Sequence, residues 1–154
     1  MPPRGRTIDQ GGRPKAYRPM PGARRRAALQ AGLNAYDNGD FFLAHELLEP
    51  AWMGADDVPE RELLQGLIKL AAAFVHAARS NPDGVVKNLR GARLRLAASG
   101  RAGERFGLDA LALITEIDRR LAGTVSSEDA PVPIRRRAVA IGPRADRGPR
   151  TPRL

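Results

Sequence analysis

The sequence predicts an all-α protein, a compact bundle of about five antiparallel helices with disordered basic tails at both ends. Apolar residues recur every three or four positions in five separate runs, which is the period of an amphipathic helix. No stretch of useful length alternates apolar and polar residues, so no strand is predicted. The links between the runs are short, and short links make consecutive helices antiparallel.

Composition divides the chain into residues 1–22, 23–123 and 124–154. The first segment has five prolines, four glycines and no apolar period, and the last is rich in glycine, proline and arginine. Segments of this kind cannot bury enough apolar surface to offset the entropy lost on ordering. Both ends are therefore predicted to be disordered, and residues 23–123 to form one helical domain.

The first two helices are expected to form a hairpin. The first covers about residues 23–38, and Asn38-Gly39 tolerates the left-handed backbone conformation that ends a helix. Asp40 follows, and its side chain is expected to cap the second helix by accepting backbone N–H bonds. That helix covers about residues 41–53.

The third helix is the most apolar and is predicted to be the central one. It is expected over about residues 59–79, since Pro59 suits the first position of a helix. A fourth helix begins at the turn of residues 81–84 and ends at Gly100. A fifth covers about residues 108–121.

The positive charge lies at the ends of the chain. Residues 1–26 carry +7, residues 27–134 carry −4 and residues 135–154 carry +6, giving the +9 of the whole. A helical body with one basic face, as expected for a dedicated nucleic-acid-binding domain, is not indicated. Nucleic-acid binding through the Arg-rich tails remains an alternative.

Several protein classes are disfavoured by what the sequence lacks. It has no cysteine, so no disulfide, thiol nucleophile or thiolate metal site is expected. No apolar run approaches the roughly 18 residues of a spanning helix, and the N-terminus lacks the apolar core of a signal peptide. A cytoplasmic protein without membrane contact is expected. No glycine-rich phosphate loop and no GxSxG nucleophile motif occurs.

The motif His45-Glu46-x-x-Glu49 places an imidazole and a carboxylate one turn apart on one helix face. This spacing lets His45 and Glu49 reach one metal ion, with Glu46 as general base, as in zinc hydrolases. No third ligand is evident in the sequence. The other interpretation is structural: His45 donates a hydrogen bond to Glu49 or to a backbone carbonyl and specifies the packing of two helices.

A second polar pattern lies on the third helix, where Gln65, Lys69 and His76 form a narrow stripe. If this stripe faces the second helix, the polar side chains converge in a pocket suited to a small molecule or a metal ion. If it faces water, it is the exposed side of an amphipathic helix. The candidate pocket residues are His45, Glu46, Glu49, Trp52, Gln65 and His76.

Two segments carry a family resemblance: GDFFLAHELLEPAW (residues 39–52) and ERELLQGLIKLAAAFVHAARSNPDGVVKNL (residues 60–89). They resemble the domain-of-unknown-function 309 family of bacteria and archaea, whose motifs include A-H-E-x-x-E-x-x-W and Q-G-L-I-x-x-A-A-A. The resemblance covers roughly residues 27–122 and departs from the family pattern at Pro50, Lys69 and Val85. It implies the helical fold, and it implies that His45, Glu46, Glu49 and Gln65 belong to a shared feature. The family has no established activity.

Three functions follow from these patterns. The first is a non-catalytic module that binds an unknown protein or small ligand, with no cofactor, through the polar cluster between helices. The second is a metal-dependent hydrolase that uses a divalent ion held by His45 and Glu49. The third is an accessory nucleic-acid-binding protein that acts through its tails.

Overall fold

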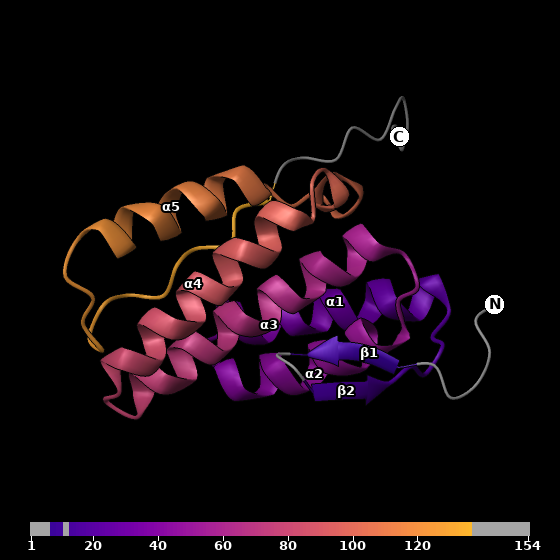
Figure 1. Ribbon diagram of the computed structural model, residues 1–154, viewed down its shortest axis with the longest axis horizontal. Coiled ribbons are helices and arrows are strands. Elements are labelled where there is room, and N and C mark those ends of the chain that lie inside the picture. The colour runs from indigo at the N-terminus through magenta and orange to yellow at the C-terminus, as the bar shows by residue number, and fades with distance from the viewer. Residues whose placement is uncertain (1–6, 11–12, 137–154) are drawn as a thin grey trace, which may run out of the picture.

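The computed structural model describes residues 7–10 and 13–136. Five α-helices form the body of the protein and confirm the predicted bundle (Figure 1). They are α1 (Gly22–Asp37), α2 (Phe41–Gly54), α3 (Val58–Ala78), α4 (Pro82–Ala98) and α5 (Ala110–Ala122). A short 3₁₀ helix, η1 (Ala102–Phe106), links α4 to α5. Each α-helix packs against the next one in the chain.

Side-chain caps fix where four of these helices begin. In each case the side chain of the residue before the helix accepts a backbone N–H bond from the third residue after it. The capping residues are Asp40 for α2, Asp57 for α3, Asn81 for α4 and Asp109 for α5. A cap of this kind contributes about 1 kcal/mol to helix stability. The cap predicted for Asp40 is confirmed.

The core is centred on α3, which lies between α2 and α4. An aromatic cluster joins three helices at one end of the bundle: the Phe41 ring lies 5.1 Å from that of Tyr36 on α1 and 5.6 Å from that of Phe74 on α3. The prediction that the third helix is central is therefore confirmed.

Along the part of the chain that the structure describes, no helix is long and apolar enough to cross a membrane.

The N-terminal segment differs from the prediction. Strands β1 (Thr7–Gln10) and β2 (Arg13–Ala16) pair antiparallel, with Thr7 opposite Ala16. The chain then passes the end of α2, where the backbone N–H groups of Arg18 and Met20 donate to the carbonyls of Met53 and Gly54. The prediction that residues 1–22 form a disordered tail is wrong for 7–10 and 13–22, because backbone pairing orders them without an apolar period. Residues 1–6 and 11–12 lie outside the described residues.

The segment after α5 also packs on the bundle. It returns alongside α5 (Figure 1), and the side chains of Val132 and Ile134 are buried. The hydroxyl of Tyr36 on α1 donates to the carbonyl of Val132 at 2.6 Å. Further along, the backbone N–H of Asp109 donates to the carbonyl of Arg135 at 3.1 Å.

The predicted disordered tail of residues 124–154 is therefore wrong for residues 124–136. Two buried apolar side chains at alternate positions are enough to anchor the segment, because groups of the bundle also form hydrogen bonds with its backbone. Residues 137–154 lie outside the described part of the chain.

We expect the Ile134→Ala variant to be less stable than the wild type by about 2 kcal/mol, because it removes a buried apolar side chain and leaves a cavity. Urea unfolding would measure the difference. The matched control is Arg135→Ala, which changes the exposed neighbour and should alter stability by less than about 0.5 kcal/mol. Equal stability of the two variants would show that the segment does not hold the bundle.

Candidate functional site

The six predicted site residues lie on two neighbouring helices. Four are on α2 and two on α3, and their environments differ. Trp52 and Gln65 are buried; His45, Glu49 and His76 are partly buried; Glu46 is exposed. Trp52 belongs to the apolar core and is only 2% exposed, so it supports the fold at this place.

Two buried polar atoms in this region stand out chemically. The Nδ1 atom of His45 on α2 and the Oε1 atom of Gln65 on α3 are both shielded from solvent, and neither has a hydrogen-bond partner among the described residues. The hydrogen bond that His45 was expected to donate is therefore not made through Nδ1. Most buried polar groups in proteins are paired, and an unpaired one costs about 1–3 kcal/mol of stability. Such groups need a physical explanation.

The register between α2 and α3 determines how far along the bundle axis His45, Glu49 and Gln65 lie. The contact between Phe41 and Phe74 and the short loop after α2 place Glu49 about level with Gln65. His45 precedes Glu49 by four residues, which corresponds to about 6 Å along the helix, so it lies about one turn away from the level of Gln65. A common pocket of His45, Glu49 and Gln65 remains a prediction.

The polar stripe of α3 makes its contacts with α4. Just before Gln65, Glu62 accepts a hydrogen bond from Arg95 of α4 at 3.2 Å. One turn after Gln65, the side chain of Lys69 lies against Gly91 of α4. Glu62 and Lys69 therefore lie against α4, at the seam between α3 and α4, and the buried Gln65 lies between them in the sequence of α3.

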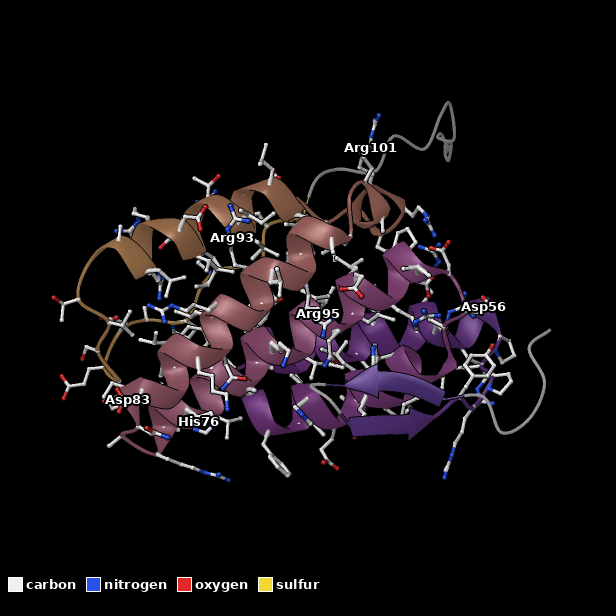
Figure 2. The ribbon with its side chains drawn as sticks, in the orientation of Figure 1. Asp56, His76, Asp83, Arg93, Arg95 and Arg101 are labelled. Carbon is white, nitrogen blue, oxygen red and sulfur yellow. The ribbon has the colours of Figure 1, made fainter. Side chains whose placement is uncertain are left out.

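His76 does not join the predicted pocket. Its ring lies against Gly84 at the start of α4, and its Nδ1 atom is 3.1 Å from the side-chain nitrogen of Asn81. Figure 2 shows His76 at the turn that joins α3 to α4. Eleven residues separate it from Gln65, about 16 Å along the helix. The prediction that His76 converges with Gln65 is wrong, because the two side chains share a face of α3 but lie three turns apart.

Sequence reasoning missed the contribution of α4 to this seam. Arg95 of α4 is partly buried and bound to Glu62 of α3. Burial lowers the pKa of Lys69, and the charges of Arg95 and Lys87 lower it further. The spacing of Lys87, Gly91 and Arg95 at four-residue intervals was the signal in the sequence, since residues four apart share a helix face.

The structure adds no third ligand to the metal site expected at His45 and Glu49. Among residues 7–10 and 13–136, no group of three or more histidine, aspartate or glutamate side chains could hold a metal ion. Glu46, the expected general base, is exposed. The described donors therefore do not make up the usual three-ligand set of a catalytic zinc site.

A cavity of about 410 Å³ lies elsewhere, between α5 and the returning C-terminal segment. Two of its acids already have partners in the protein. Hydrogen bonds from Arg119 and Arg120 hold the pKa of Glu116 at about 2, and Asp109 caps α5. The seam around Gln65 and Lys69 remains the better candidate site, because its polar groups include unpaired ones.

Comparison with known protein families gives a match over part of the chain. Residues 29–88 match the model of the family described as "Domain of unknown function (DUF309)". The matched stretch runs from α1 into α4 and contains all six predicted site residues. No curated protein and no solved structure matches the chain. The resemblance to this family that the motifs predicted is therefore confirmed over residues 29–88.

Proposed function

We propose that this domain is a non-catalytic binding module. Its ligand is a small polar molecule or a peptide segment of a partner protein, held by hydrogen bonds to Gln65 and His45. The observation that carries the proposal is the Oε1 atom of Gln65, which is buried on the central helix and has no partner among the described residues.

The chemistry of the two groups sets what the ligand must offer. An amide oxygen only accepts hydrogen bonds, so the ligand supplies an N–H or O–H group to Gln65. The Nδ1 atom of His45 donates or accepts according to the tautomer of the ring. A bound ligand with both kinds of group would remove the energetic penalty of the two unpaired atoms.

Recognition suits these groups better than catalysis. Glu46 is exposed on α2, whereas Gln65 is buried on α3. A hydrolase at His45 and Glu49 would need a third ligand for its metal, and the described residues supply no such cluster. The proposed module needs no cofactor.

The cytoplasm is the location we propose for this module. The chain has no cysteine, whereas small secreted domains commonly depend on disulfides. A role in nucleic-acid binding would depend mainly on the Arg-rich ends, most of which lie outside the described residues, and no described contact favours it.

Native mass spectrometry of the purified protein tests the proposal. We expect wild-type protein to retain a bound molecule, and the Gln65→Leu and His45→Phe variants to retain at least about tenfold less, since each loses a hydrogen bond to it. The Gln30→Leu variant is the matched control, because Gln30 is exposed on α1 and bonds only to Asn34 in the described structure. A wild-type protein without bound species, or a species retained by both site variants, would refute the module.

Stability of the free protein gives a second test. Gln65→Leu replaces an amide whose buried oxygen is unpaired by an apolar side chain of similar size, so the ligand-free variant should be more stable by about 1–3 kcal/mol. Urea unfolding after removal of any bound species would measure it. Gln30→Leu should stay within about 0.5 kcal/mol of the wild type. Loss of stability in Gln65→Leu would instead mean that the amide makes a structural hydrogen bond.

A further inference from the structure

A partly buried lysine lies in the seam between α3 and α4, one turn after Gln65. The side chain of Lys69 crosses α4 at Gly91: a β-carbon at this glycine would lie 2.7 Å from Cδ of the lysine and 3.7 Å from Nζ. A β-carbon at this position would displace the lysine side chain from its place against α4. Glycine inside a helix is less favourable than alanine, so helix stability alone does not account for Gly91.

The charges facing Lys69 from α4 are also positive. Arg95 and Lys87 lie close enough to lower its pKa, in addition to the larger effect of burial. Figure 2 shows Arg95 at the seam between α4 and α3. Glu62 on α3 is bound to Arg95 at 3.2 Å. In the described part of the chain, the side chain of Lys69 has no ion pair and no hydrogen bond.

Another partly buried cation of this protein, unlike Lys69, has a counter-charge. Arg25 on α1 is also partly buried, but it is paired with the buried carboxylate of Glu60 and donates a further bond to the carbonyl of Met20. Burial of a charge is costly unless the charge is paired. The fold thus supplies a counter-charge to Arg25 and leaves Lys69 without one.

We infer that the α3–α4 seam binds an oxyanion, a phosphate or carboxylate group, between Nζ of Lys69 and the cations of Lys87 and Arg95. An oxyanion here would supply the missing negative charge and accept hydrogen bonds from the ammonium group. The lysine would be fixed by its passage over Gly91. This site does not depend on the hydrogen-bonding role proposed for Gln65, although a ligand large enough could reach both.

Binding of inorganic phosphate to the full chain, measured by calorimetry, tests the inference. Wild-type protein should bind phosphate saturably, and Lys69→Met should bind it at least about tenfold more weakly. The matched control is Arg90→Gln, which removes one positive charge from an exposed position of the same helix and should change the affinity less than about twofold. A parallel titration with acetate distinguishes a phosphate ligand from a carboxylate ligand. Tighter binding of phosphate would indicate the former, and tighter binding of acetate the latter.

A second variant moves the lysine without changing the charge of the protein. In Gly91→Ala the new methyl group displaces the Lys69 side chain, so phosphate binding should also weaken at least about tenfold while circular dichroism shows an intact helical fold. In the wild type, nuclear magnetic resonance of the Lys69 side chain should show its pKa rising towards the ordinary value when phosphate is added.

Two results would overturn the site. One is the absence of saturable binding of either anion to wild-type protein. The other is an equal phosphate affinity of Lys69→Met and Arg90→Gln, which would mean that phosphate responds only to the net charge.

Discussion

The close packing of α3 against both of its neighbours is the constraint on which the rest of the structure depends. On the α4 side, a β-carbon at Gly66 would lie 2.8 Å from Cγ of Leu96 and 3.2 Å from its backbone nitrogen, so the two helices almost touch. On the α2 side, Phe74 packs against Phe41. A helix enclosed in this way has little surface left for water. Its polar side chains, Gln65 and Lys69, are consequently withdrawn from solvent at the seam.

This burial makes the polar stripe energetically significant. A domain of this size has a total stability of about 5–15 kcal/mol, so two unpaired buried atoms at about 1–3 kcal/mol each are a substantial loss. Elsewhere in the described residues, buried polar groups are paired, as Arg25 and Glu60 show. Local departures from good packing and pairing are expected at functional sites. Gln65, His45 and Lys69 are departures of this kind, which is why both proposals are placed there.

The sequence predicted the parts of the fold that depend on local physics. Helical periods and caps such as Asp40 identified the five helices, because backbone hydrogen bonds and caps are satisfied within a few residues. The segments ordered by distant contacts were missed: Val132 and Ile134 are held by a bundle that begins a hundred residues earlier. For the strands at 7–10 and 13–16, the Gly11-Gly12 pair between them was an available hairpin signal.

The stripe on α3 was also predicted, but its neighbour was not. Periodicity tells which residues share a face, whereas the helix that covers this face is decided by packing of the whole bundle. A crystal structure of the ligand-free protein, at a resolution that fixes side-chain amides, tests the central claim most directly. The account predicts that no protein donor lies within hydrogen-bonding distance of the Gln65 amide oxygen. A backbone or side-chain N–H bound to this oxygen would contradict it.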